Sequence, residues 1–201
     1  MRPVTLDAAP GAGGQPLFVE FVNTLHWYDS APIELIGTQA EFAAWLAAYG
    51  LPAHDLGDCL PTVHLLRQHV RGITEAVAAG RAPLEADLAA LDAALGAPQG
   101  HLALVGPDTP RAQLAFATQA SDVDLFTLRV ALSLATFLGS SQRHRLKLCA
   151  NPDCGFAFVD TSTNATRRWC YMRYCGNRFK ARAFRRRSRQ PSARRPIAAT
   201  S

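Results

Sequence analysis

The sequence lacks several features that would place it among membrane, secreted or nucleotide-binding proteins. Its 201 residues contain no apolar run of the ~18 residues that a transmembrane helix needs, since Asp124 and Arg129 interrupt the longest candidate, 123–138. The start of the chain carries Asp7 and several Pro and Gly instead of the continuous apolar stretch of a secretory signal. No phosphate-loop or dinucleotide-binding motif is present. We therefore expect a cytoplasmic protein without a membrane partner.

Charged residues are scarce, and acidic ones are almost absent from the C-terminal part. Only 18% of the residues are charged, whereas 48% are hydrophobic, a composition that excludes a disordered chain and allows a sizeable core. Residues 1–142 carry six Lys and Arg against fourteen Asp and Glu, whereas residues 143–201 carry fifteen against two. The sequence therefore predicts an acidic N-terminal module followed by a basic one.

The acidic module is predicted to be mainly helical, with a small β element. Capping residues and recurring apolar positions predict four helices, at about 38–49, 61–79, 83–95 and 121–138. Pro83 is expected in the first turn of the third helix, with Leu84, Leu88, Leu91 and Leu95 on one side of it. Short alternating segments at 101–105 and 111–118 predict a two-stranded hairpin. The apolar segment 17–25 fits either a short strand or a buried helix, because periodicity does not separate the two.

Four of the five cysteines form two close pairs in the basic module. Four residues separate Cys149 from Cys154 and also Cys170 from Cys175, and fifteen residues lie between the pairs. Two such pairs, brought together by a hairpin, supply the four thiolates of a tetrahedral Zn²⁺ site. Disulfide bonds are disfavoured in the cytosol, and the spacing differs from that of iron–sulfur proteins. We therefore predict one structural zinc ion per chain.

A run of basic residues surrounds and follows the second cysteine pair. From Gly176 onward the sequence predicts a helix with arginines recurring on one side. Because arginine binds phosphates and guanine edges, we expect a nucleic-acid-binding surface. Its candidate residues are Arg167, Arg168, Arg173, Arg178, Lys180, Arg182, Arg185, Arg186 and Arg189. Trp169, Tyr171 and Tyr174 could stack on bases, although packing beside the zinc is the simpler interpretation of Trp169. A solvated surface, or docking onto the acidic module of the same chain or of a second copy, would leave the same pattern.

Two sequence strings resemble the signature of the CGNR zinc-finger family. They are RRWC at 167–170 and CGNR at 175–178, and EFVNT at 20–24 resembles the opening motif of the ABATE domain that commonly precedes this finger. The resemblance implies zinc binding by all four paired cysteines, and it implies a stress-linked transcriptional regulator. DNA is then the expected partner.

The predicted architecture is α+β and has four parts. They are a loose N-terminus over 1–15, a mainly helical ABATE-like domain with a small β element over 16–142, a zinc-ribbon or treble-clef-like finger ending in a basic helix over 143–187, and a disordered basic tail over 188–201. We expect the helical domain to sense a ligand or to dimerise. The effector would be a small molecule, which the sequence does not identify.

Polar residues within the apolar segment 17–25 leave a second interpretation open. Glu20, Asn23 and Thr24 could line a small-molecule pocket, although a buried hydrogen-bond network is the simpler explanation. No catalytic constellation is recognisable, and four thiolates leave zinc no open position for water, so we expect no enzymatic activity. The alternatives are an RNA-binding or ribosome-associated zinc protein, and a small-molecule-binding protein or enzyme with its pocket in the N-terminal domain.

Overall fold

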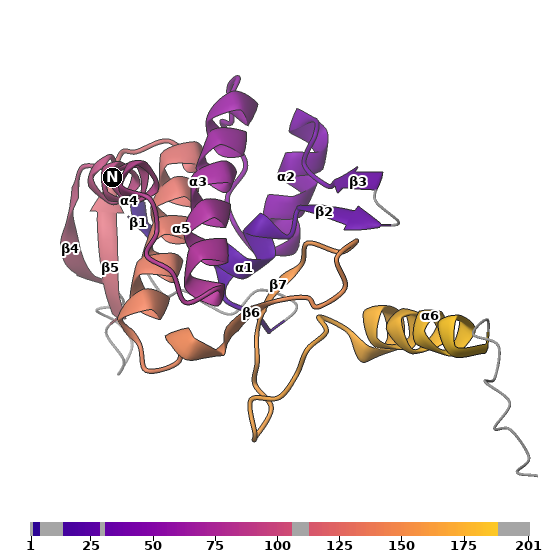
Figure 1. The fold of residues 1–201 in the computed structure, drawn as a ribbon. Helices are drawn as coiled ribbons and strands as arrows, with labels where there is room; N and C mark the ends of the chain where they lie inside the picture. Colours follow the sequence, from indigo (N-terminus) through magenta and orange to yellow (C-terminus); the bar gives the residue numbers. More distant parts are fainter. Residues whose placement is uncertain (1, 5–13, 29–30, 106–112, 189–201) are drawn as a thin grey trace, which may run out of the picture.

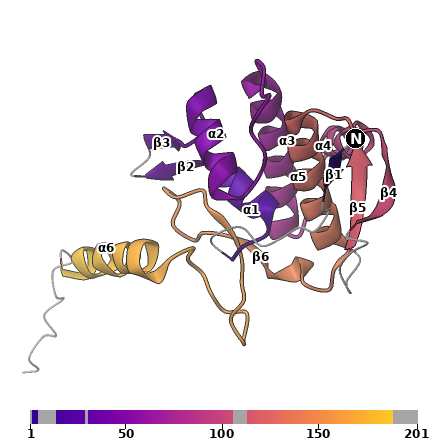
Figure 2. The same cartoon turned by 180° about the vertical axis from the view of Figure 1, so that it is seen from behind.

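The computed structural model describes residues 2–4, 14–28, 31–105 and 113–188, which form a helical body with one protruding C-terminal helix (Figures 1 and 2). The helices are α1 (Leu17–Val22), α2 (Gln39–Ala48), α3 (Leu60–Ala78), α4 (Glu85–Gly96), α5 (Asp122–Gly139) and α6 (Asn177–Ser188), with a 3-10 turn η1 (Arg143–Arg145) and a π-turn η2 (Met172–Gly176). The strands are β1 (Arg2–Val4), β2 (Leu25–Tyr28), β3 (Ala31–Glu34), β4 (Gly100–Val105), β5 (Gln113–Thr118), β6 (Leu146–Leu148) and β7 (Ala157–Val159). Within the described ranges, every helix is too short or too polar to span a lipid bilayer.

Two helices begin at reciprocal capping boxes. At α2, the Thr38 hydroxyl accepts a hydrogen bond from the Glu41 N–H, and the Glu41 carboxylate accepts one from the Thr38 N–H. Ser121 and Asp124 make the same exchange at the start of α5. Each box satisfies two backbone donors that the first helical turn leaves open. Both helices therefore begin where the sequence predicts.

Helix α1 lies in the centre of the core. The segment 17–25 divides between the two predicted alternatives, because α1 occupies most of it and β2 begins at its last residue. Phe21 of α1 contacts Phe126 of α5 edge to face, with ring centroids 5.1 Å apart, and Phe126 contacts Phe42 of α2 at 5.2 Å. Each such pair contributes about 0.5–1.5 kcal/mol beyond its buried area. The three aromatic rings thereby join α1, α2 and α5.

Two predictions about the N-terminal module need correction. The segment 1–15, expected to be loose, contains β1, which pairs antiparallel with β5 in a sheet of order β1-β5-β4; residues 5–13 lie outside the described part. The third helix begins at Glu85 instead of Pro83. Leu84 is its N-cap, with extended backbone, so its side chain precedes the buried face and is 71% exposed. The β4–β5 hairpin is confirmed.

The hydrophobic core continues from the helices into the cysteine-bearing segment. Strands β6 and β7 pair antiparallel and contact α3 and α1, respectively. Leu146, Ala157 and Val159 of these strands are buried in the same cluster as the core residues of the helices. The change from acidic to basic sequence near residue 142 therefore does not separate two independently packed cores.

Candidate metal centre and basic surface

Four cysteine thiols converge beside the β6–β7 hairpin. The loop between these strands carries Cys149 and Cys154, whereas Cys170 and Cys175 come from the next loop and from η2. All four residues are buried, their sulfurs lie within 4.8 Å of one another, and none forms a disulfide bond. The topology thus brings together all four predicted ligands, two from the hairpin loop, one from the next loop and one from η2.

The spacing of the sulfurs fits a zinc ion. A tetrahedron with Zn–S bonds of ~2.3 Å places neighbouring sulfurs about 3.8 Å apart. Cys154 Sγ lies 3.6 Å from Cys170 Sγ, which lies 3.7 Å from Cys175 Sγ. Four soft sulfur donors in this arrangement favour zinc over magnesium or calcium. The cluster is a site for one structural zinc ion.

The thiols also shift one another's ionisation. Hydrogen bonds from Cys154 and Cys170 lower the pKa of Cys149 to about 2. The hydrogen bond between Cys154 and Cys149 raises the pKa of Cys154 to about 12. Hydrogen bonds to Cys149 and Cys154 raise the pKa of Cys170. Without a cation, the cluster therefore favours one thiolate, since further negative charges would lie too close together. Zinc supplies the positive charge that allows all four to ionise.

Main-chain hydrogen bonds shape the first cysteine loop. The Cys149 N–H donates to the carbonyl just before β7 at 2.8 Å, and the Cys154 N–H donates to Asn151 O at 3.1 Å. Gly155 follows with φ at +67°, a left-handed conformation that glycine adopts without strain. The Asn151 amide donates to the sulfur of Cys175 at 3.7 Å and so links the two cysteine pairs.

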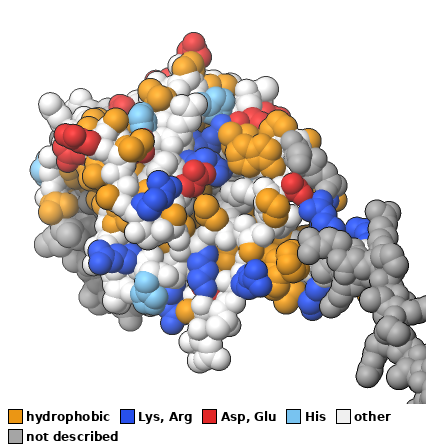
Figure 3. Space-filling view, viewed as in Figure 1, with side chains coloured by type: hydrophobic (Ala, Val, Ile, Leu, Met, Phe, Trp, Pro, Cys, Tyr) orange, Lys and Arg blue, Asp and Glu red, His pale blue; other side chains and the backbone are white. Residues whose placement is uncertain are grey.

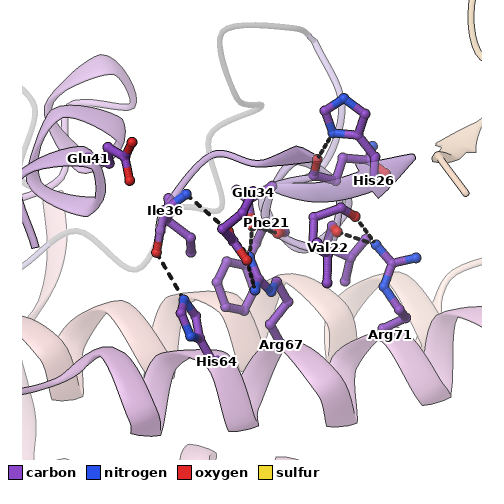
Figure 4. Close-up of polar contacts among 12 residues, drawn as sticks. Phe21, Val22, His26, Glu34, Ile36, Glu41, His64, Arg67 and Arg71 are labelled. Carbon is purple, nitrogen blue, oxygen red and sulfur yellow. Dashed lines mark hydrogen bonds and ion pairs between the residues drawn. The ribbon is translucent and has the colours of Figure 1, made fainter. Parts of the chain in front are cut away.

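The helical body holds this loop from the outside. The Trp27 N–H of β2 donates to Cys154 O at 3.0 Å, and Arg71 Nη1 of α3 donates to Gly155 O at 3.1 Å. The second terminal nitrogen of Arg71, Nη2, donates to main-chain carbonyls at the end of α1 and the start of β2 (Figure 4). One guanidinium therefore connects α1, α3, β2 and the zinc loop, a role that the sequence analysis did not foresee.

Asn23 connects α1 to the second strand of the zinc hairpin. Its side-chain amide donates to Ala157 O at 2.9 Å, and its oxygen accepts from the Ala157 N–H at 2.8 Å. Asn23 thus satisfies both main-chain groups of Ala157 on the outer edge of β7, as a neighbouring strand would. The sequence predicts that Asn23 either lines a pocket or joins a buried hydrogen-bond network, and in the structure it forms such a network.

Thr24 does not join Glu20 and Asn23 in one site. Thr24 is buried, and its hydroxyl accepts from Arg67, whose guanidinium also pairs with Glu34 of β3 (Figure 4). The Glu20 carboxylate accepts a hydrogen bond from the hydroxyl of Tyr49, the C-cap residue of α2, at 3.2 Å. A cavity of about 250 Å³ beside the cysteine cluster is lined by Glu20 and Asn23, but Thr24 is not among its lining residues.

Comparison with known families matches both parts of the chain. The profile of the CGNR zinc finger matches residues 145–188. The ABATE profile, described as "Putative stress-induced transcription regulator", matches residues 15–141, which is more than half of the chain. The chain belongs to the ABATE family. Its zinc site is the metal centre of a CGNR finger, and together the two matches support a zinc-binding regulator. A comparison with curated proteins found no match.

Several predicted nucleic-acid-binding residues of the CGNR finger make contacts within the folded chain. The guanidinium of Arg167 lies 4.6 Å from the centroid of an aromatic ring in β7. Its Nε donates a hydrogen bond to the main-chain carbonyl two residues further along the chain. Arg178 lies over the Tyr28 ring of the ABATE domain at 4.4 Å. Arg182 pairs with Asp153 in the first cysteine loop, at 2.6 Å. The arginine side of α6 that the sequence predicts is therefore partly engaged at the base of the helix.

The other described members of the predicted set are exposed to solvent. They are Arg168, Arg173, Lys180 and Arg185, and Arg182 is exposed as well although it pairs with Asp153. The side chain of Arg186 and all of Arg189 lie outside the described residues. On the face in Figure 3, most Lys and Arg side chains lie in the lower half and most Asp and Glu side chains in the upper half. The separation of charge along the chain is therefore also a separation on this face.

Exposed aromatic side chains lie among these arginines. Tyr171 and Tyr174 are 53% and 59% exposed, and their rings meet edge to face at 6.3 Å. The guanidinium of Arg173 lies 5.8 Å from the Tyr174 ring. Trp169, by contrast, is half-buried and packs against Phe179 of α6, with ring centroids 5.7 Å apart. The two tyrosines therefore remain accessible, whereas the tryptophan supports the helix.

Asp160, which the sequence analysis did not single out, anchors the loop between β7 and the second cysteine pair. Its fully buried carboxylate accepts from Lys147 Nζ at 2.7 Å, the Ser162 hydroxyl at 2.6 Å and the Arg167 N–H at 2.9 Å. Burial disfavours the charge, but these hydrogen bonds outweigh it and hold the pKa of Asp160 well below its usual range. One sequence feature could have indicated this role of Asp160, because residues 143–201 contain just two acidic side chains.

Replacing Asp160 with asparagine is expected to lower the free energy of unfolding by about 3 kcal/mol at neutral pH, because Lys147 would lose its buried counter-ion. Asp153→Asn, which removes the more exposed partner of Arg182, should cost about 1 kcal/mol or less. Urea unfolding measures both values. Because the pKa of Asp160 is lowered on folding, its stabilisation is present above about pH 4 and is lost as the pH falls further. Equal costs for the two variants would contradict this assignment.

Proposed function

We propose that this protein is a DNA-binding transcriptional regulator, rather than an enzyme, and that its CGNR finger presents α6 to DNA. The observation that supports this most is the protrusion of α6 from the body, with Lys180 and Arg185 exposed on it (Figures 1 and 2). The two carboxylates of residues 143–201 each pair with a basic residue of the same segment, Asp153 with Arg182 and Asp160 with Lys147. The exposed arginines are therefore left to attract phosphates.

Zinc has a structural role in this proposal. Cys175 lies two residues before α6, and the cluster ties it to the loop between β6 and β7. The metal would thereby fix the direction in which α6 leaves the body. The ABATE domain is assigned the sensing or dimerising role, which is supported by the core that it shares with β6 and β7. A change of packing in that core would reach the base of the finger directly.

Fluorescence anisotropy with a labelled DNA duplex at several salt concentrations tests the proposal. Binding is expected at low salt and should weaken steeply as salt rises, because each phosphate contact releases counter-ions. The double variant Arg173→Glu, Arg185→Glu should weaken binding at least tenfold, whereas the double variant Thr62→Glu, Gln68→Glu, at two exposed positions of the ABATE domain, should leave it nearly unchanged. No binding at low salt, or equal effects of the two variants, would overturn the proposal.

RNA binding is a second candidate function, favoured by the exposed rings of Tyr171 and Tyr174. Aromatic side chains stack on unpaired bases, at about 1–3 kcal/mol per base, but reach few bases in a duplex. The same titration with a single-stranded RNA separates the candidates. If RNA is the partner, the wild type binds the single strand more tightly than the DNA duplex, and Tyr171→Ala with Tyr174→Ala removes that preference.

A further inference from the structure

A cavity of about 580 Å³ lies at the junction of the ABATE domain and the finger. It is formed by the C-terminal end of α3, the start of α4, the end of α5 and the turn η1. Val77, Leu88 and Leu138 provide apolar walls. Its volume lies within the ~300–1,000 Å³ typical of small-molecule sites. None of the three residues that the sequence proposed for a pocket lies in this cavity.

The polar lining of this cavity carries the positive charges of two arginines. It comprises Arg81, Arg143 and His144, all exposed to solvent. Among the described residues, neither arginine has an ion pair or a side-chain hydrogen bond, so no carboxylate of the structured chain neutralises them there. Arg81 is one of just six Lys and Arg in residues 1–142, which also contain fourteen acidic residues, and Arg143 is the first residue of the basic part of the chain. Two arginines without counter-ions beside an apolar cavity therefore stand out from their surroundings.

We propose that this cavity binds a small anion with an apolar body, of the class of aromatic or short aliphatic carboxylates. The apolar walls would cover the body of the ligand and exclude water from it. The guanidinium groups of Arg81 and Arg143 would donate to its carboxylate, for which the planar arginine fork is well suited. Apolar lining with a few polar groups at one end is the usual composition of a small-molecule site.

The position of the cavity connects it to the zinc finger. Arg143 begins η1, and Arg145, two residues later, donates to Asp160 O at 2.9 Å and Ser162 O at 2.8 Å. The next residue begins β6. A ligand held by Arg143 would therefore act at the start of the segment that leads into the first cysteine pair. Control of DNA binding by this route rests on the proposed function, but ligand binding itself does not.

The test uses the full-length, zinc-loaded chain and matched probes. Calorimetric titration with 1-naphthoate should show saturable binding, and the isosteric neutral 1-naphthamide should bind at least tenfold more weakly. The double variant Arg81→Gln, Arg143→Gln should lower the affinity for 1-naphthoate at least tenfold, and Arg185→Gln on α6 should leave it unchanged. Both arginines are exposed, so the variant should keep the melting temperature of the wild type.

Several outcomes would overturn the ligand site. They are equal affinities for the acid and the amide, wild-type affinity in the folded double variant, and the absence of saturable binding by benzoate, decanoate and 1-naphthoate alike. Anisotropy with the DNA duplex in the same samples keeps the two proposals apart. If the chain binds 1-naphthoate but no DNA, the ligand site is supported and the proposed function is contradicted. If it binds DNA but not 1-naphthoate, the proposed function is supported and the ligand site is contradicted.

Discussion

Chelation of zinc is expected to open part of the ABATE domain as well as the finger. Apparent binding free energies of structural zinc are roughly 10–16 kcal/mol, comparable with the ~5–15 kcal/mol that stabilises a whole domain. Loss of the metal would release the loop at Cys154 and Gly155, to which Trp27 and Arg71 donate hydrogen bonds. Hydrogen exchange should therefore show lost protection in β2, β3, β6 and β7, together with a lower melting temperature of the whole chain.

Two cysteine variants provide the control for this experiment. Cys154→Ser removes a zinc ligand and should reproduce the effect of chelation, with zinc content falling from one ion per chain. Cys59→Ser changes a buried cysteine outside the cluster and should keep the zinc. A chelated chain that keeps full protection in β2 and β3 would refute the coupling. A chain that folds normally without any metal would refute the structural role of zinc.

Replacing Asn23 with alanine is expected to lower the free energy of unfolding by about 3 kcal/mol. The substitution leaves the buried N–H and carbonyl of Ala157 without partners, at about 1–3 kcal/mol for each group. Asn177→Ala is the matched control, because Asn177 is exposed and makes one side-chain hydrogen bond, to Arg173 O; it should cost less than about 0.5 kcal/mol. Urea unfolding of both variants gives the comparison. A similar cost at the two positions would mean that Asn23 does not tie α1 to β7.

The features that the sequence predicts correctly depend on neighbours within a few positions. Each capping box joins residues three apart, as in Thr38 and Glu41 or Ser121 and Asp124. The zinc ligands follow the same logic, because each cysteine pair is brought together by a short loop. In both cases the spacing of residues close in sequence is enough to predict the local structure.

The features that the sequence does not predict join distant segments. Asn23 and Ala157 are 134 positions apart, and β1, which precedes the residues matched by the ABATE profile, pairs with β5 at Gln113–Thr118. Arg182 and Arg185 are equivalent by composition and spacing, but Asp153, 29 positions earlier, pairs with the first alone. Such choices depend on which surfaces meet in the folded chain, and local periodicity contains no information about that.

The core shared by the helices and the β6–β7 hairpin restricts how this chain could be divided or recombined. A finger cut away near residue 142 would expose Leu146, Ala157 and Val159 to water, and the remaining ABATE domain would expose the faces of α1 and α3 that cover them. Neither piece is therefore expected to fold independently when it is fused to an unrelated protein. A protease that nicked the linker would leave two fragments still held together by that buried contact. The finger and the ABATE domain are therefore expected to unfold and to be degraded as one unit.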